Sequence, residues 1–183
     1  MEEQNGRKNR KKKGREKTQP SLLSDLLFLL LKVGVIVLIV IVVFTFFFGM
    51  ARVRDNAMDP SLKDGDLVIY YRLDKEYLAN DLVIVRKGDD EQVRRVVGIA
   101  GDRIDINRDN GLEINGFPQQ EENVYSETLP VVGKTAFPVT VATGQIFVLG
   151  DNRKYALDSR TYGCVNLSDT RGKVIVVIRR RNL

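Results

Sequence analysis

The 183 residues are enough for one compact domain with an appendage, but two full domains are not expected. The net charge of +5 comes from the first 32 residues; the remainder has equal numbers of basic and acidic side chains, so nucleic acid is not expected as a partner. Histidine is absent, which excludes a Ser-His-Asp or Cys-His apparatus and any histidine-based metal site.

Residues 1–25 form a basic tail, whose composition predicts no folded core. An apolar run follows over residues 26–50, interrupted by Lys32. Its part from Val33 to Met50 would reach about 27 Å as a helix, close to the hydrocarbon thickness of a bilayer. A cleaved secretory signal is the alternative, but the run is longer than the usual apolar region of such signals. We therefore expect a transmembrane helix at 26–50.

The basic tail lies on the N-terminal side of this span, and positive flanks remain in the cytoplasm. The sequence therefore predicts a single-pass plasma-membrane protein whose N-terminus is cytoplasmic. Residues 51–183 would form the extracellular domain, and the lipid bilayer is the first expected partner.

Beyond the span, short runs rich in Val and Ile alternate with turns containing Gly, Asp and Asn, which is typical of strands. The sequence "RDNG" between two alternating runs predicts a hairpin. Residues 118–138 are expected to form a long loop. We predict a mainly β fold with an antiparallel ectodomain, and strands at 66–71, 81–87, 92–99, 102–107, 111–116, 145–150 and 173–180.

Three motifs occur in order after the apolar run: "AMDPSL" from Ala57, "RRVVGIAGD" from Arg94 and "GDNRKYALDSR" from Gly150. Together with the anchor they resemble the type I signal peptidases, membrane Ser-Lys proteases that remove signal peptides from exported proteins. The resemblance covers the chain from the helix onward. It implies a β ectodomain of the signal peptidase I type.

The same resemblance implies that the catalytic residues are replaced. The family's serine aligns with Ala57, which has no hydroxyl, and its lysine aligns with Arg94. An arginine stays protonated even when buried, so it cannot act as a general base. Ala156 stands where the family has a serine that holds the lysine. Asp55 lies near the family's oxyanion site, where a carboxylate would repel the charge that develops during the reaction.

Other family positions are retained. The resemblance assigns the substrate-binding role to Asp55, Asn56, Ala57, Met58, Pro60 and Arg94. The structural frame of the site would consist of Arg95, Gly98, Gly101, Asp102, Gly150, Asp151, Asn152, Arg153, Ala156, Asp158, Ser159 and Arg160. No metal ion or cofactor is expected, and the single Cys164 has no partner for an internal disulfide.

A relocated dyad would need a hydroxyl from Ser61, Ser159 or Ser168 and an amine from Lys63, Lys154 or Lys173. Such a pair is an alternative that the sequence leaves open. A laboratory substitution is another, but it would account for Ala57 alone.

The favoured hypothesis is a non-catalytic, membrane-anchored member of the signal peptidase I family. It resembles Gram-positive, pilus-associated members that lack both catalytic residues, which implies binding of exported preproteins or pilin subunits and assistance in their assembly, with sortase machinery as a possible further partner. The alternative is an active signal peptidase that cleaves secreted preproteins, or an inactivated copy of one. A plain membrane-anchored adhesin or β-module would leave the three ordered motifs unexplained.

Overall fold

The computed structural model describes residues 22–132 and 134–180, and the chain divides into two compact units, Met1–Val40 and Ile41–Leu183. Helix α1, Leu22–Phe47, has no buried residue and is long and apolar enough to cross a membrane. It ends three residues before the predicted boundary, because the chain pairs with a neighbouring strand from Phe48 onward. Most of the predicted basic tail lies outside the described residues.

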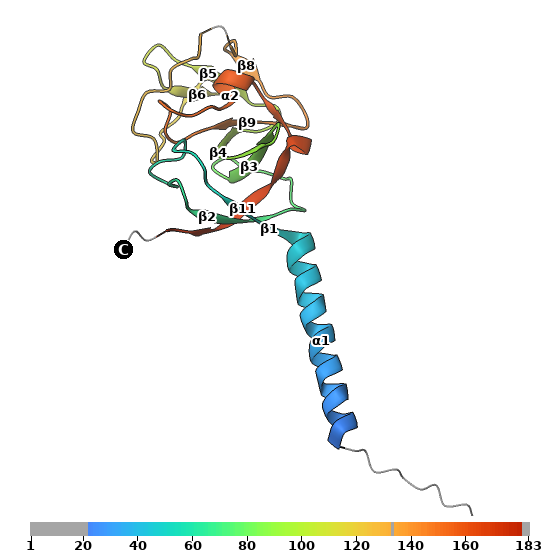
Figure 1. The fold of residues 1–183 in the computed structure, drawn as a ribbon. Helices are drawn as coiled ribbons and strands as arrows, with labels where there is room; N and C mark the ends of the chain where they lie inside the picture. Colours follow the sequence, from blue (N-terminus) through green and yellow to red (C-terminus); the bar gives the residue numbers. More distant parts are fainter. Residues whose placement is uncertain (1–21, 133, 181–183) are drawn as a thin grey trace, which may run out of the picture. The chain divides into compact units, whose positions relative to one another are not determined.

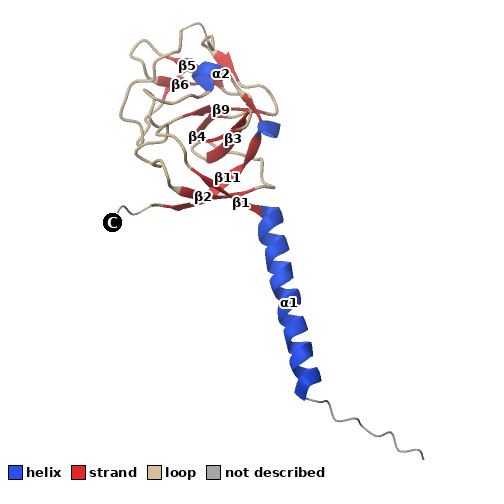
Figure 2. Cartoon of the chain, viewed as in Figure 1, coloured by secondary structure: helices blue, strands red, loops and turns tan. Residues whose placement is uncertain are grey.

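The second unit consists mainly of strands and loops, and all of its strand pairs are antiparallel (Figures 1 and 2). This confirms the prediction of a mainly β fold. A seven-stranded sheet has the order β1-β2-β11-β3-β4-β9-β10, and a four-stranded sheet has the order β7-β6-β5-β8. The larger sheet comprises β1 Phe48–Arg52, β2 Leu67–Tyr71, β3 Leu82–Lys87, β4 Asp90–Gly98, β9 Gln145–Leu149, β10 Val165–Asn166 and β11 Thr170–Ile178; the smaller comprises β5 Arg103–Ile106, β6 Leu112–Ile114, β7 Phe117–Pro118 and β8 Val139–Thr140.

Each of the seven predicted strands corresponds to an observed one, and β5 and β6 form the predicted hairpin. The sequence missed β7, β8 and β10, which have two residues each, and β1, which is hidden in the apolar run. It also missed helix α2, Ser159–Tyr162, and the 3-10 turn Leu167–Asp169, which are too short to show a helical period. Asp158 caps α2 by accepting a hydrogen bond from the backbone of Arg160.

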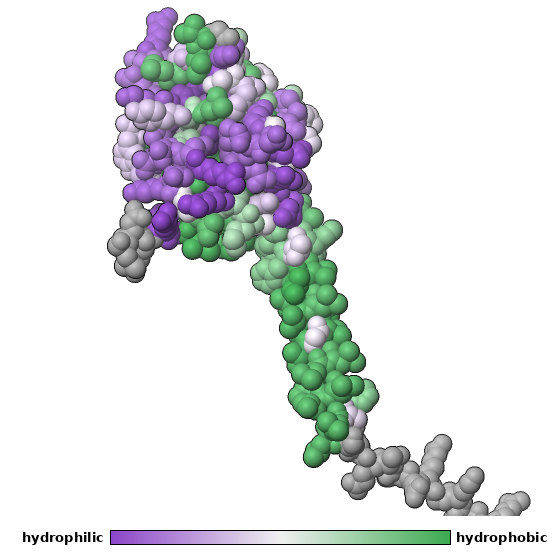
Figure 3. All heavy atoms as spheres, in the orientation of Figure 1, coloured by the Kyte–Doolittle hydropathy of each residue, from purple (hydrophilic) through white to green (hydrophobic). Residues whose placement is uncertain are grey.

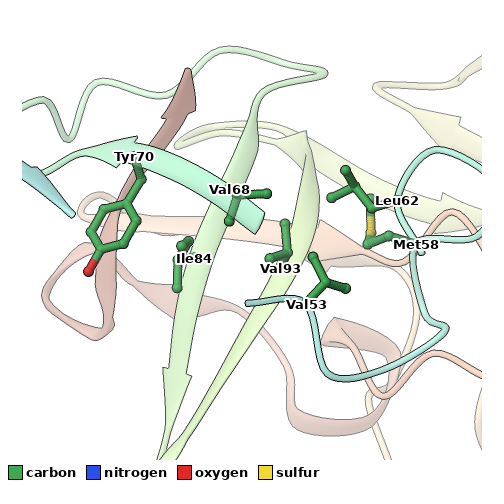
Figure 4. Packing of buried hydrophobic residues seen from close by; sticks show 7 residues of the cluster. All are labelled: Val53, Met58, Leu62, Val68, Tyr70, Ile84 and Val93. Atoms are coloured by element: carbon green, nitrogen blue, oxygen red, sulfur yellow. The ribbon is translucent and has the colours of Figure 1, made fainter. Parts of the chain in front are cut away.

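A buried cluster fixes the turn that follows β1. Met58 and Leu62 from this turn pack with Val68 of β2, Ile84 of β3 and Val93 of β4 (Figure 4). Both turn residues are almost completely buried. The turn that carries the first motif is therefore held by the core and not only by its own hydrogen bonds.

Strand β4 contributes to all three hydrophobic clusters of the unit, with Val93 in the first, Val96 in the second and Val97 in the third. It pairs with β3 from Asp90 to Arg95 and with β9 from Arg95 to Gly98. The second motif begins on this central strand, so its side chains extend into the interior.

Candidate functional site

The first motif forms a turn beside β4. Ala57 is 2% exposed, its N–H donates to Asp55 Oδ1 over 3.2 Å, and its carbonyl accepts from Asn152 N–H over 2.9 Å. The third motif is thus hydrogen-bonded directly to the residue at the expected nucleophile position. Asn56 and Pro60 are exposed on the same turn, whereas Met58 lies in the core.

Arg94 reaches the same place from β4, with a side chain that is 1% exposed. Its Nε donates to the carbonyl of Leu157 over 2.9 Å, and one terminal nitrogen donates to the carbonyl of Val93 over 2.6 Å. The other terminal nitrogen forms an ion pair of 2.8 Å with Asp55 Oδ2. Burying a cation is costly unless it is paired and hydrogen-bonded, and all three nitrogens of this guanidinium have acceptors.

Sequence reasoning missed this role of Asp55. The sequence predicts for Asp55 a place in substrate binding and an effect on an oxyanion, whereas in the structure its two oxygens hold the Ala57 turn and pair with Arg94. The signal available in the sequence was an acidic residue, Asp55, near the first motif and an arginine, Arg94, in the second. The two are thirty-nine positions apart, and this spacing alone does not show that they form an ion pair.

The third motif packs tightly against Ala57. A Cβ atom at Gly150 would lie 2.3 Å from Cβ of Ala156 and 2.6 Å from the carbonyl oxygen of Ala57. No side chain fits there, so this glycine is required by close approach. The structure thus brings Ala57, Gly150 and Ala156 together.

Ion pairs join the motifs to one another. Arg95 of the second motif binds Asp151 of the third through two hydrogen bonds of 2.7 and 2.6 Å. Within the third motif, Asp158 accepts two side-chain bonds from Arg160, each 2.9 Å long, and a backbone bond from Gly150. Such bidentate pairs fix both partners in one orientation.

The remaining frame positions have identifiable contacts. Arg153 donates to the carbonyl of Gly150 over 2.8 Å and pairs with Glu121, which holds the long loop between β7 and β8. Ser159 Oγ accepts from Val148 N–H over 3.0 Å. Gly98 leaves room for Ile104, and Gly101 has a φ of +95° in the turn that Asp102 closes by accepting from Ile99 N–H.

A pocket of about 300 Å³ borders the ion pair, between Asp55, Leu157 and the first half of β4. Within the described residues, β4 has a strand neighbour on only one edge from Asp90 to Arg94. Gln92 Oε1 is buried there without a hydrogen-bond partner among the described residues. The pocket therefore borders an open strand edge, and its lining includes Arg94 but not Ala57.

Three of the six residues considered for a relocated dyad have side-chain hydrogen-bond or ion-pair partners elsewhere. Ser61 Oγ accepts a long bond of 3.4 Å from Arg95, Ser159 is held as described above, and Lys173 forms an ion pair with Asp81.

A different hydroxyl and amine do meet. Lys75 Nζ lies 3.0 Å from Thr170 Oγ1, and burial, followed by repulsion from Arg171, lowers the pKa of Lys75. The Thr170 hydroxyl, however, donates to the carbonyl of Leu167 over 2.7 Å, accepts from Tyr77 and is buried. The hydroxyl proton of Thr170 already takes part in a hydrogen bond, and a substrate cannot reach the buried hydroxyl. Lys75 and Thr170 therefore have the geometry of a structural cluster.

Tyr162 lies close to the ion pair. Its hydroxyl is buried without a hydrogen-bond partner in the described part of the chain. Burial raises the pKa of Tyr162 well above its usual value, an effect that Arg94 opposes and that Asp158 and Asp55 reinforce. The phenol therefore stays protonated and cannot replace the missing base near neutral pH. Among the residues that the structure describes, no group of three acidic or cysteine side chains is placed to hold a metal ion.

Comparisons with known proteins give one consistent result. A family model described as "Signal peptidase, peptidase S26" matches residues 26–179. The chain is similar to "Signal peptidase I" of Bacillus licheniformis, with 35% identity over 127 residues, which are 63% of this chain and 67% of the relative. It is also similar to "Signal peptidase IB" of Staphylococcus aureus, with 29% identity over 168 residues, covering 82% of this chain and 87% of the relative.

Among solved structures, a crystal structure of a signal peptidase I from Enterococcus faecalis V583 is similar, with 27% sequence identity and a TM-score of 0.45. The match covers 55% of this chain and 97% of that chain.

Proposed function

Because the chain belongs to the peptidase S26 family of signal peptidases, we propose that it is a non-catalytic member that binds exported or pilin precursors and assists their assembly. The observation that carries the proposal is the Asp55–Arg94 ion pair beside Ala57. A Ser-Lys protease needs a hydroxyl and a neutral amine, and this site has a methyl group and a cation with its counter-ion.

The open edge of β4 supports a binding role. An extended peptide can add to an unpaired strand edge through backbone hydrogen bonds, while a neighbouring pocket receives alternate side chains. The pocket next to Asp55 and Leu157 lies along that edge. Binding of this kind requires no nucleophile, so it can persist after the chemistry is lost.

We propose the three-part organisation expected from the sequence, with a tail at 1–25, a span around 26–50 and a binding domain at 51–183. The relatives are named signal peptidases, and α1 is long and apolar enough for a single span. The proposed orientation puts the N-terminus in the cytoplasm and the β unit outside, where exported precursors emerge. Sortase machinery would be a neighbour in this location.

The relatives named signal peptidase favour one alternative, an active peptidase. Incubation of the purified full-length protein in detergent with a signal-bearing preprotein distinguishes a non-catalytic protein from an active peptidase. We expect no cleavage while an active signal peptidase, run in parallel, processes the same substrate. Specific cleavage that disappears when a residue of this chain is substituted would overturn the non-catalytic assignment.

The binding half of the proposal is tested by capture. Full-length protein extracted from membranes is expected to retain candidate pilin precursors, and a strain that lacks the protein is expected to assemble fewer pili. Normal pili in the deletion strain, together with no captured precursor of any exported protein, would contradict the assembly role.

A further inference from the structure

A second pocket lies between the third motif and the loop that joins β7 to β8, residues 119–138. This loop pocket has a volume of about 410 Å³ and shares no lining residue with the pocket beside β4. The apolar part of its lining consists of Leu129, Pro130, Val131 and Ala156. In Figure 3, hydrophobic groups lie among hydrophilic ones at the top of the β unit, where Figure 1 draws part of this loop.

Buried arginines of the third motif hold the loop in place. Arg153, which is 3% exposed, donates to Glu121 Oε2 over 2.9 Å. Arg160 donates to the carbonyl of Leu129 over 3.2 Å, and its own carbonyl accepts from Thr135 N–H over 3.2 Å. Hydrogen bonds to a charged donor fix the geometry of both partners. The loop pocket is therefore formed before any ligand binds, which lowers the cost of binding.

The rim of the loop pocket carries an available positive charge. Lys154 lines the pocket, is exposed and has no acidic partner among the described residues. Its Nζ lies 5.5 Å from the ring centre of Tyr155, a contact that leaves the ammonium free to bind a carboxylate. The apolar wall next to this cation fits an aliphatic side chain with an acidic neighbour.

The loop pocket and the β4 pocket meet at one short stretch of the third motif. Lys154 and Ala156 line the loop pocket, whereas Tyr155 and Leu157 line the β4 pocket. The Cα atoms of residues 154 and 157 are at most about 11 Å apart, because each residue spans no more than about 3.6 Å. An extended peptide rises about 3.3 Å per residue, so a single peptide of fewer than about ten residues can reach both pockets.

We propose that the loop pocket is a second contact site for the exported precursor. An aliphatic side chain of the precursor would pack against Leu129 and Ala156, and an acidic neighbour would pair with Lys154. Both would lie within about ten residues of the segment that adds to β4. The inference rests on the proposed binding function, and it names the feature by which a precursor is selected.

Photocrosslinking shows whether one precursor occupies both pockets. Benzoylphenylalanine replaces Leu129, Leu157 or Leu73 in the full-length protein in detergent, and a purified pilin precursor is the probe. We expect positions 129 and 157 to crosslink to the same precursor, at sites within about ten residues of each other. Leu73 is the matched control, because it is 51% exposed, as Leu129 is, and lines neither pocket; it is expected to give no crosslink.

The outcomes separate this inference from the proposed function. A crosslink from position 157 alone would overturn the second contact site and leave precursor binding at β4 intact. A crosslink from position 129 alone would overturn the shared peptide, and a crosslink from 129 to a second copy of this chain would identify a dimer interface instead. If neither position crosslinks and the parent captures no precursor, both proposals fail.

Charge reversal tests the chemistry of the loop pocket. We expect K154E to weaken precursor binding by about threefold or more, because it replaces an attraction by a repulsion. K63E makes the same change at an exposed lysine outside both pockets and should bind like the parent. An acid-to-lysine substitution in the precursor, at the site mapped from position 129, should restore binding to K154E. Equal binding by K154E and K63E, or no such rescue, would overturn the proposed pairing with Lys154.

Discussion

Arg94 is held by acceptors from three places in the chain: the turn before Ala57, the third motif at Leu157 and its own strand. A guanidinium can bind three separate acceptors because its donors point in fixed, divergent directions within one plane. The residue therefore connects the same motifs that a catalytic lysine would connect, but it does so as a permanent cation. Its contacts join the turn before Ala57 to the third motif.

The ion pair makes Asp55 the residue that decides whether a restored dyad can work. In A57S/R94K, the carboxylate of Asp55 would pair with the new ammonium and raise the pKa of the lysine by about 1 to 3 units. The base must be neutral to accept the serine proton, so activity would appear only at higher pH. We expect D55N/A57S/R94K to cleave a preprotein at a pH about 1 to 3 units lower than A57S/R94K.

The measurement is the pH profile of preprotein cleavage, with D55N alone as the control that should remain inert. Identical profiles for the double and triple variants would show that Asp55 does not control the base. The absence of cleavage by either would show that Ala156 and other changes also block the chemistry.

Removing Asp55 should also destabilise the fold, because Arg94 would remain buried without its counter-ion. We expect D55A to lower the free energy of unfolding by about 2 to 4 kcal/mol, below the top of the usual range because the Asp55 side chain is 38% exposed. D105A removes a surface partner 3.9 Å from Arg103 and should cost less than about 1 kcal/mol.

Urea unfolding of the full-length protein in detergent, followed by circular dichroism, measures both changes. D55A/R94M should recover part of the lost stability, since it removes the unpaired charge. If D55A and D105A cost the same, the buried ion pair has no special structural role.

The raised pKa of Tyr162 predicts that the fold loses stability at alkaline pH. Its folded pKa is raised above the ordinary value near 10, chiefly by burial, so the folded state keeps the phenol proton longer than the unfolded state. Stability from this difference is present below the unfolded pKa and is lost as the pH rises above it. We expect Y162F to be as stable as the parent or slightly more stable at neutral pH, because it removes a buried hydroxyl without a partner.

Above pH 10, Y162F should lose less stability than the parent, as measured by urea midpoints across the alkaline range. Tyr125, which is 79% exposed, provides the control Y125F. Parallel alkaline curves for parent and Y162F would contradict the prediction.

At the scale of elements, β4 places both the ion pair and the open edge. Its second half is covered by β9, and its first half borders the pocket near Leu157. The turn with Met58 is anchored in the core, so bulky changes there would disturb folding and binding together. Leu157, which is 49% exposed, is a better position for a test.

We expect L157W to fill the pocket and reduce capture of a precursor by about tenfold or more, since a bulky group would block the peptide path. The backbone carbonyl that binds Arg94 is unchanged by this substitution. L73W, at a site that is 51% exposed and outside the pocket, should bind like the parent. Equal capture by L157W and L73W would show that precursors bind elsewhere.

For the whole molecule, the proposed orientation puts the β unit outside the cell. Burial raises the pKa of the Cys164 thiol, which makes it a poor target for labelling. We therefore expect C164S/S168C, with a new thiol at an exposed position, to react with a membrane-impermeant maleimide in intact cells. C164S/R10C, in the basic tail, should react only after lysis. If the thiol of C164S/R10C reacted in intact cells and that of C164S/S168C reacted only after lysis, the proposed orientation would be wrong.

The sequence by itself predicted the family, the apolar run and seven of the strands, and it shows an alanine at position 57 and an arginine at position 94. These features are local, because a strand period, an apolar run or the lack of a hydroxyl depends only on residues that are close together in the sequence. The glycines and the charged residues that the three motifs retain could also be identified directly from the sequence.

Only the tertiary structure decided which residues meet. It paired Asp55 with Arg94, placed Met58 in the core and put Lys75 beside Thr170. It also showed that β1 and β2 have a second apolar face, which the apolar run had hidden. Such contacts depend on sheet register and on turns between residues far apart in the chain, and a one-residue change of register would reverse the face that each side chain occupies.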